Sequence, residues 1–445
     1  MGKQYRVGCK ELDEFGRGTV TFNNRKFAVP YMLPGEKGNI ELVYRPEETG
    51  ARLVSIDEAS KDRVKPVCPV YEKCGGCQLM HMSYEAQLKF KQGKIEALFP
   101  KEAAKGCIQP ILPMDPPYHY RHKVYASFSR NKRGETVAGI YEENSHRIVC
   151  TKNCSIQQEQ ANRIIETVIM LMKKKRIEPY QEDRGTGVLR HVYIRVGKQT
   201  GQIMAVLVTG CRDFPGKKQF VEELCKAHPE ITTLVHNVND KKTSMILGEK
   251  ETVLFGKGYI EDMLCGFTFR ISPKSFYQVN PEQTERLYET AVSFAGLTGR
   301  ETVLDAYCGI GTISMIASKK SEKVIGVELN ADAVRDARNS AKHNNCNNVE
   351  FICGDAGEYM KKCGISPDVV FLDPPRSGSD EKFLVALAKT APKRIVYISC
   401  NPQTQQRDVE LLKKRGYRVE KIQAVDCFCQ TWHVECVVLM SRVEK

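Results

Sequence analysis

From about residue 280 onward, apolar runs that end in polar residues alternate with stretches of helical periodicity. The apolar runs are VLDAYCG, VIGVELN, VEFICGD, VVFLDPP and RIVYISC, and helix-like segments such as ADAVRDARNSAKHN and KFLVALAKTA lie between them. This alternation indicates βαβ units and a mostly parallel, doubly wound sheet of the Rossmann-like α/β class. The closing segments YRVEKIQAVD and HVECVVLM predict a final pair of strands.

The chain upstream of this sheet follows a different pattern. Residues 1–62 hold short apolar segments, such as RGTVTF and ARLVSI, that glycine and proline separate, which predicts a small β-barrel. Residues 84–99 have the apolar spacing of a helix. From about residue 118 to 270 the pattern is mostly β, with RHVYIRV and QIMAVLVT flanking GKQTG as a hairpin and one helix over about 155–175.

The length and charge of the chain narrow its class. Its 445 residues are enough for about three domains. A formal net charge of +13 favours a polyanionic partner such as nucleic acid, and a basic surface kept for solubility is the alternative. The first thirty residues contain no signal-peptide core, and no apolar run of about eighteen residues occurs. We therefore expect a cytoplasmic protein without a membrane partner, acting as a monomer.

Polar or reactive side chains follow five of the predicted strands. They are Asp305, Glu328, Asp355, Asp373 and Cys400. In an open α/β sheet, ligands bind outside the carboxyl ends of the strands. The sequence therefore predicts that these five residues converge on one rim of the sheet.

The loop after Asp305 favours one class of cofactor. Gly309-Ile310-Gly311 lets the backbone approach a ligand closely, although an ordinary tight turn has the same glycines. A dinucleotide fingerprint needs a third glycine, and Ser314 stands in its place. Glu328 can accept hydrogen bonds from ribose hydroxyls. S-adenosylmethionine fits this loop better than NAD because it has no pyrophosphate.

The last two predicted strand ends carry the candidate chemistry. Asp373-Pro374-Pro375 is similar to the loop that many nucleobase methyltransferases place beside the target base. Arg376 stands where amino-directed enzymes have a stacking aromatic residue, which argues against methylation of an exocyclic nitrogen. Cys400 lies between a strand end and a polar helix start, where a lowered pKa would make its thiol a nucleophile. A buried, inert thiol is the alternative.

A cysteine has a clear use if the base is uracil. C5 of uracil is a poor nucleophile, and addition of a thiolate at C6 makes C5 enolate-like and able to attack a sulfonium methyl group. A base must then remove the C5 proton so that the thiol can leave. Glu435, at the start of the last predicted strand, is the candidate base. His433 is a competing candidate, but strand alternation places it on the same face as Glu435, so it could equally orient the site.

The stretch CPVYEKCGGC, residues 68–77, concentrates three of the 18 cysteines of the chain. A disulfide is disfavoured in a reducing compartment. Zinc sites usually bring cysteines in pairs, and no second pair lies near this one. The spacing alone leaves both zinc and an iron–sulfur cluster open.

Five motifs occur in the order FYQVNP, DAYCGIGTIS, FLDPPRSG, YISCNPQT and HVE. Together they resemble the RNA (uracil-5-)-methyltransferases that use S-adenosylmethionine. The resemblance implies Cys400 as the nucleophile, Glu435 as the base that removes the C5 proton, and Asp373 beside both the uracil and the cofactor. It implies further cofactor contacts by Gln278, Tyr307, Glu328 and Asp355. In the family pattern D-x-F-P-x-T-x-H-V-E, which spans Asp426–Glu435 here, Cys429 replaces the proline.

The resemblance extends to the N-terminal half of the chain. GRGTVTF and KFAVPYMLPGE are similar to the TRAM domain, an RNA-binding β-barrel with an OB-like fold. Members with this domain hold a 4Fe–4S cluster on four cysteines, which implies the ligands Cys68, Cys74, Cys77 and Cys154, with Cys150 competing for the fourth position. The implied domains are a TRAM-like barrel over 1–62, a central iron–sulfur and β-rich domain over 63–270, and a methyltransferase domain over 271–445. Part of 85–120 is expected to pack with the methyltransferase domain.

The same resemblance implies the substrate. The barrel and the cluster together favour 23S ribosomal RNA, with transfer RNA as the alternative. A different class of function is a redox-responsive RNA-binding protein without catalysis, against which the intact Cys400 and Glu435 argue. A third possibility is amino-group methylation through the Asp373 loop alone.

Overall fold

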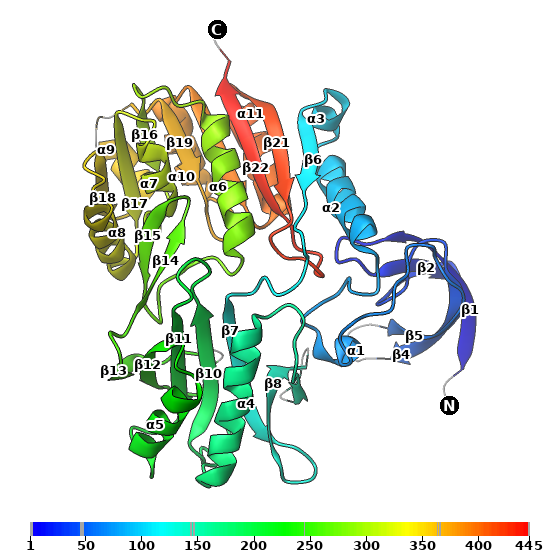
Figure 1. Ribbon diagram of the computed structural model, residues 1–445. Helices are drawn as coiled ribbons and strands as arrows, with labels where there is room; N and C mark the ends of the chain where they lie inside the picture. Colours follow the sequence, from blue (N-terminus) through cyan, green and yellow to red (C-terminus); the bar gives the residue numbers. More distant parts are fainter. Residues whose placement is uncertain are drawn as a thin grey trace.

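The computed structural model describes residues 3–44, 49–142, 145, 147–243, 245–362, 364 and 366–443. Figure 1 shows a curled N-terminal sheet, a central sheet and a C-terminal sheet, which meet around the middle of the molecule. Within the described ranges, no helix has the length and apolar character needed to cross a membrane.

The N-terminal sheet is antiparallel, with the strand order β3-β2-β1-β4-β5. Its strands are β1 (Gln4–Leu12), β2 (Gly18–Phe22), β3 (Arg25–Val29), β4 (Lys37–Tyr44) and β5 (Thr49–Glu58). The sheet curls so that β3 and β5, its two edges, approach each other around a small core that includes Val7, Val20 and Ile40. β1 adds a strand that the apolar segments did not predict, because Val7 and Cys9 are its only two buried residues.

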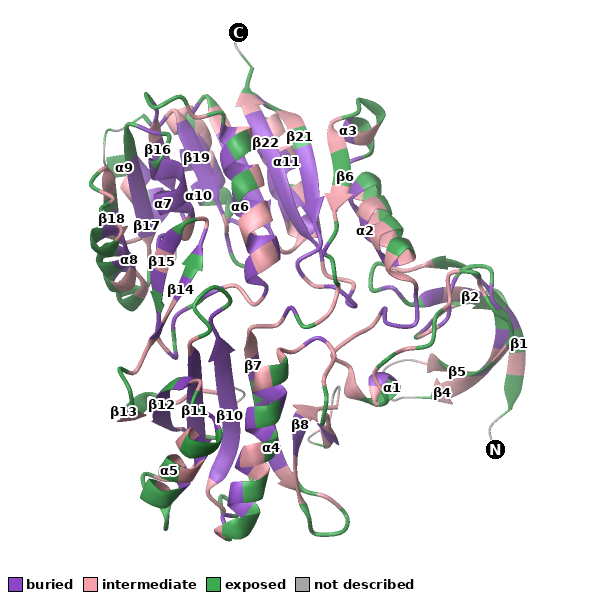
Figure 2. Ribbon diagram, viewed as in Figure 1, coloured by how far each residue is buried: buried purple, intermediate pink, exposed green. Residues whose placement is uncertain are grey.

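The central sheet has seven strands in the order β13-β12-β11-β10-β7-β8-β9. They are β7 (Lys123–Arg130), β8 (Thr136–Tyr141), β9 (Ile148–Cys150), β10 (Leu189–Val196), β11 (Ile203–Thr209), β12 (Ile231–Val238) and β13 (Lys250–Phe255). The predicted hairpin is confirmed, because β10 and β11 pair antiparallel across the GKQTG turn. Both strands are buried along their whole length, since helices cover one face and the C-terminal half of the chain covers the other (Figure 2).

The prediction of a single helix in this region is wrong. Besides α4 (Glu159–Lys174), the chain forms α5 (Lys217–Ala227), which connects the parallel strands β11 and β12. A parallel connection needs such a crossover. The signal in α5 is weak, because Phe220 and Leu224 are its only buried residues.

The C-terminal sheet is the predicted doubly wound α/β sheet. Its eight strands have the order β18-β17-β16-β19-β20-β22-β21-β6. The first five in this order are parallel, and β22 runs antiparallel to β20 and β21. The eight strands are β6 (Ile108–Leu112), β16 (Thr302–Asp305), β17 (Lys323–Glu328), β18 (Val349–Cys353), β19 (Val369–Leu372), β20 (Arg394–Ser399), β21 (Tyr417–Val425) and β22 (Glu435–Arg442).

Helices cover both faces of this sheet and bury its two apolar layers. They are α6 (Pro281–Ala295), α7 (Thr312–Ser318), α8 (Ala331–His343), α9 (Ala356–Lys362), α10 (Glu381–Thr390) and α11 (Pro402–Lys413). A hairpin of β14 (Ile260–Leu264) and β15 (Phe267–Ile271) packs into the same core as α6.

A segment from the N-terminal half completes the C-terminal sheet. It contains α1 (Tyr71–Cys74), α2 (Tyr84–Leu98), α3 (Pro100–Ala104) and β6 (Ile108–Leu112). β6 pairs parallel with β21 and forms the edge of the sheet, and Ile95 and Phe99 pack into the sheet's core. Figure 1 shows α2 between this sheet and the N-terminal sheet, so α2 contacts both.

Candidate active site and cysteine-lined cavity

The candidate cofactor-binding residues lie around the carboxyl ends of the parallel strands. Asp305 ends β16 and is fully buried, and burial raises its pKa to about 6. Its Oδ2 accepts a hydrogen bond from the Ser314 hydroxyl at 2.6 Å, whereas Oδ1 has no hydrogen-bond partner. A buried carboxylate oxygen without a partner is costly, so it is suited to a polar ligand group.

The glycine loop after Asp305 is shaped by two left-handed residues. Gly309 and Gly311 have φ values of 54° and 83°. A Cβ at Gly311 would lie 2.4 Å from the Phe351 ring, so a side chain cannot fit there. The Gly309 N–H donates to Glu328 Oε2 at 3.1 Å, which holds the Glu328 carboxylate against the loop.

The other predicted cofactor residues have separate structural partners. The Tyr307 hydroxyl donates to Ser379 Oγ at 3.3 Å, and Gln278 Nε2 donates to the Tyr288 hydroxyl at 3.4 Å. Asp355 is exposed, and its Oδ1 accepts from the Glu358 N–H at 2.8 Å at the start of α9. That contact is a helix cap.

Cys400 and Glu435 lie opposite each other on neighbouring strands. The antiparallel register of β20 and β22 pairs Ser399 with Cys436. Cys400 directly follows Ser399 and Glu435 directly precedes Cys436, so the same register brings these two residues together at the end of the ladder. Asp373, at the end of β19 beside β20, also acts electrostatically on both.

Burial and neighbouring charges favour the protonated forms of both groups. Burial, followed by the charges of Glu435 and Asp373, raises the pKa of Cys400 to about 11. Burial and then Asp373 raise the pKa of Glu435 to about 8. Arg376 opposes both shifts, through its charge and through a hydrogen bond to the thiol. The expectation that the start of the helix lowers the Cys400 pKa is therefore wrong for this resting site, where burial dominates.

Three carboxylates gather at this rim. Burial raises the pKa of Asp373 to about 7, and the charge of Asp305 adds to the shift. With Asp305 and Glu435, Asp373 places three acidic side chains at the carboxyl ends of β16 and β19 and at the start of β22, where ionisation of the two aspartates gives a negative potential. S-adenosylmethionine carries a cationic sulfonium and an ammonium group, so the donor set of this rim fits it.

His433 does not share the strand with Glu435. β22 begins at Glu435, so the alternation that would place both side chains on one face does not reach His433. The His433 ring stacks against Trp432 with centroids 3.9 Å apart, and burial lowers its pKa to about 4. It is neutral at physiological pH.

The loop that leads to Glu435, residues 426–434, is held by buried polar side chains. Lys91 Nζ lies 2.5 Å from Asp426 Oδ1 and donates to the Phe428 carbonyl at 3.1 Å. The Tyr84 hydroxyl donates to Asp426 Oδ2 at 2.9 Å, and Asn280 Nδ2 donates to the Cys427 carbonyl at 3.0 Å. The loop is thus fixed by α2 and by the start of α6.

The sequence does not predict the side chains that hold this loop. On α2, helical spacing places Tyr84, Gln87 and Lys91 on one side, whereas the sequence pattern shows only the apolar spacing of a helix. The sequence does not show that these side chains are buried, because their hydrogen-bond partners lie more than three hundred positions away in the chain. In the sequence, Arg376 is only the residue that replaces the aromatic side chain of amino-directed enzymes, and nothing there predicts its hydrogen bond to Cys400.

Four cysteines line one cavity of about 220 Å³. They are Cys68, Cys74, Cys77 and Cys154. The other walls include Tyr71, Met80 and Ile156, and Cys150 is not among the lining residues. Burial and the neighbouring thiols raise the pKa of Cys77, and the nearby Arg121 lowers it.

As placed, no three His, Cys, Asp or Glu side chains in the described part of the chain form a group that could hold a metal ion. Cys427 and Cys429, both buried, form no such group either. A cube of four irons binds each thiolate through a different iron, so its ligands lie farther apart than those of a single zinc ion. The chemistry of four thiols around one small cavity fits such a cluster.

Comparison with known proteins agrees with this geometry. Residues 216–443 match the family model described as tRNA (Uracil-5-)-methyltransferase. RNA methyltransferases of Halalkalibacterium halodurans and Oceanobacillus iheyensis are 41% and 42% identical over 441 and 444 residues, which is 98% of this chain and 96% of each relative. The fold and rim define an S-adenosylmethionine-dependent methyltransferase. The chain belongs to the RNA (uracil-5-)-methyltransferase family.

A solved structure is similar over nearly the whole chain. It is the tRNA (uracil-54, C5)-methyltransferase of Pyrococcus abyssi in complex with S-adenosyl-L-homocysteine. The TM-score is 0.79 at 26% identity, and the match covers 98% of this chain and 99% of that one. The similarity therefore includes the N-terminal and central sheets as well as the catalytic sheet.

Proposed function

We propose that this enzyme methylates C5 of a specific uridine in 23S ribosomal RNA in the cytoplasm, and that it acts as a monomer. The observation that supports the chemistry is the pairing of β20 with β22, which sets Cys400 opposite Glu435 beside Asp373. The excess of basic residues supports an RNA substrate. S-adenosylmethionine supplies the methyl group.

In the proposed mechanism, the Cys400 thiol gives its proton to water, and the thiolate Sγ bonds to C6 of the flipped-out uracil. The electron pair displaced from the C5–C6 double bond makes C5 nucleophilic, and the methyl group would pass to C5 as its bond to the sulfonium sulfur breaks, which leaves S-adenosylhomocysteine. Glu435, as a carboxylate, then removes the C5 proton. The C5–C6 double bond re-forms, and the Cys400–C6 bond breaks to release the thiolate.

The charges of the site suit these steps. Arg376 favours the thiolate form of Cys400 and the ionised form of Glu435, because its effect on both pKa values is to lower them. Asp373, with its pKa raised to about 7, can donate or accept a hydrogen bond at the uracil edge. Gln278, Tyr307, Glu328 and Asp355 are the proposed cofactor contacts, together with Asp373. Extrusion of the base is easiest from a loop or a single strand.

A 4Fe–4S cluster is proposed on Cys68, Cys74, Cys77 and Cys154. Their shared cavity supports this set, and it favours Cys154 over Cys150. Anaerobically purified protein should be brown and contain iron and sulfide. Cys74→Ser and Cys154→Ser should abolish the colour, and Cys150→Ser is the matched control that keeps it. A colourless wild-type protein containing zinc would overturn the proposal.

The proposed domains are a TRAM-like barrel over 1–62, a central domain over 63–270 and the methyltransferase domain over 271–445. The pairing of β6 with β21 supports assigning part of the segment after residue 84 to the methyltransferase domain. Because the barrel and the cysteine-lined cavity occur together, we favour ribosomal RNA. The similarity to a transfer RNA enzyme supports transfer RNA as the second candidate.

One experiment tests both the chemistry and the substrate. Glu435→Gln should form a covalent adduct with RNA that survives a denaturing gel, because the last proton is never removed. Cys400→Ala should form none. Ribosomal and transfer RNA pools are tested separately, with tritiated cofactor in the wild-type arm. Label and adduct in transfer RNA alone overturn the ribosomal assignment, and methylation by Cys400→Ala overturns the covalent mechanism in favour of amino-group chemistry. Neither label nor adduct in any pool favours a binding protein without catalysis.

A further inference from the structure

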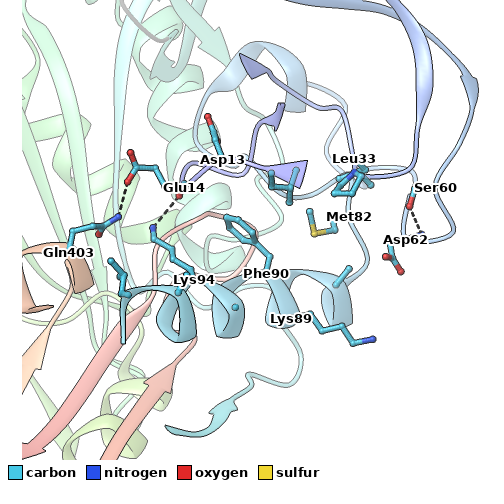
Figure 3. A pocket seen from close by; sticks show the side chains of 16 residues that line it. Asp13, Glu14, Leu33, Ser60, Asp62, Met82, Lys89, Phe90, Lys94 and Gln403 are labelled. Carbon is cyan, nitrogen blue, oxygen red and sulfur yellow. Dashed lines mark hydrogen bonds between the residues drawn. The ribbon is translucent and has the colours of Figure 1, made fainter. Parts of the chain in front are cut away.

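A cavity of about 570 Å³ lies between the N-terminal sheet, α2 and the start of α11 (Figure 3). This volume is in the range of ligand sites for small molecules. The walls are largely apolar and include Leu12, Leu33, Met82 and Phe90. The mechanism above makes no use of this cavity.

One end of the cavity lies next to the active site. Gln403, which lines it, is three residues beyond Cys400 and donates to Glu14 Oε2 at 3.0 Å. Lys94, on the α2 wall, donates to the Glu14 carbonyl at 3.1 Å, as Figure 3 shows. The same ammonium lies 4.5 Å from the centroid of the Trp432 ring, three residues before Glu435. A nucleotide adjacent to the target uridine therefore has this cavity within reach.

A glycine in the middle of α2 keeps the cavity open. Gly93 lines it, and a Cβ built at this position would meet no atom within 4 Å. Glycine in a helix interior is unfavourable compared with alanine. No left-handed backbone and no close packing requires it here. Gly93 is exposed, and the space beside it is open to a ligand.

The polar groups around the cavity suit a nucleobase better than a phosphate. The lining includes the carboxylates of Asp13, Glu14 and Asp62, whose charge disfavours a phosphate, and the nearby Arg17 pairs with Asp13 at 2.7 Å. Burial lowers the pKa of Lys94 to about 8, so this side chain loses its proton more readily than an exposed lysine does. Ser60, Asp62, Glu14 and Gln403 place hydrogen-bonding groups along the apolar walls. A nucleobase has two apolar faces and a polar edge, which matches such a lining.

We propose that this cavity binds the base of a nucleotide that flanks the target uridine in the RNA substrate. The inference rests on the proposed RNA methylation. In this proposal, the N-terminal sheet and α2 together form a base-binding site that is continuous with the loop 426–434. Occupation of the cavity by a flanking base fixes which uridine reaches Cys400.

The test fills the cavity from Gly93. Gly93→Phe places a ring in the cavity, and Gly93→Ala is the matched control that removes the glycine but leaves most of the space. Binding is measured by anisotropy of a labelled single-stranded RNA that is methylated by the wild type. Gly93→Phe should weaken binding about tenfold, the loss of one well-seated base. Gly93→Ala should bind as the wild type does.

A second readout locates the RNA. Trp432 is the only tryptophan of the chain, so its fluorescence reports on this end of the cavity. RNA should quench it in the wild type and in Gly93→Ala, and quench it less in Gly93→Phe at the same RNA concentration. If Gly93→Phe fails to fold by circular dichroism, Ala97→Phe fills the same cavity from the next turn of α2.

The outcomes separate this proposal from the proposed function. Wild-type affinity and quenching in a folded Gly93→Phe protein overturn the cavity proposal, even where methylation proceeds. If no RNA pool is methylated but RNA binding is lost selectively in Gly93→Phe, the cavity proposal stands and the proposed activity fails. Quenching by an apolar peptide but not by RNA would assign the cavity to a protein partner and overturn the inference.

Discussion

Lys91 Nζ and Asp426 Oδ1 are 2.5 Å apart, and neither side chain is exposed. The two residues join α2, from the N-terminal half, to the start of the loop that leads to Glu435. Lys91 also donates a hydrogen bond to the Phe428 carbonyl, and Asp426 accepts one from the Tyr84 hydroxyl. It is thus a buried polar network that links the position of Glu435 to a helix distant in sequence.

Removal of one partner of this pair should destabilise the protein strongly. Lys91→Met leaves Asp426 buried without its cation, which costs about 3–5 kcal/mol in the free energy of unfolding. The double variant Lys91→Met/Asp426→Leu should recover part of that loss, because no unpaired charge remains. Urea unfolding followed by circular dichroism measures both. A single variant as stable as the wild type would contradict the network described here.

The binding of S-adenosylmethionine should strengthen as pH rises. The pKa values of Asp305 and Asp373 are raised to about 6 and about 7, and a cationic ligand favours their ionised forms. The affinity should therefore increase between about pH 5.5 and pH 7.5, with protons released on binding. Calorimetry in buffers of different ionisation enthalpy measures both quantities.

S-adenosylhomocysteine is the control for this prediction. It lacks the methyl group and the sulfonium charge but keeps the adenosine and the amino acid. Its affinity should depend less on pH than that of S-adenosylmethionine. Equal pH dependence of the two ligands would show that the carboxylates do not sense the sulfonium.

The sequence predicts the α/β sheet well because each of its parallel strands is a short apolar run between helical segments. The same rule, that ligands gather at the carboxyl ends of strands, brings Asp305, Asp373 and Cys400 to one rim. The pairing of β20 with β22 then adds Glu435. These relationships depend on local patterns and strand order.

The rest depends on contacts between distant segments. The protonation of Cys400 is set by burial and by Glu435, and neither is visible in the residues around the thiol. Likewise, β6 joins the C-terminal sheet from a segment that looks like a connection in the sequence. The helix α5 is a polar surface helix with two buried residues, so its periodicity is too weak to predict it.

The contact between Phe15 and Trp432 should couple the N-terminal sheet to the loop that leads to Glu435. The two rings meet edge to face, with centroids 5.1 Å apart. A double-mutant cycle of Phe15→Ala and Trp432→Ala, measured by urea unfolding with circular dichroism, should give a coupling energy of about 0.5–1.5 kcal/mol. Tyr44→Ala, at an exposed ring on β4, is a control that should show no coupling with Trp432→Ala.

The raised pKa of Glu435 predicts that this carboxyl lowers stability at neutral and alkaline pH. The group titrates near its ordinary value of 4.5 in the unfolded chain and at about 8 in the folded protein. Between these values the folded state holds a proton that the unfolded state has lost, so stability falls as pH rises. The slope for one group is about 1.4 kcal/mol per pH unit.

Glu435→Gln removes this titration while keeping the shape of the side chain. The variant should therefore be more stable than the wild type at pH 8, by about 3–5 kcal/mol when the whole interval counts. Below pH 4.5 the difference between the two proteins should level off, because both states of the wild type are then protonated. Urea unfolding at pH 4, 6 and 8 measures the difference, with Glu96→Gln on the exposed face of α2 as the control. A difference that does not change with pH would show that Glu435 is already ionised in the folded protein, ready to accept the C5 proton.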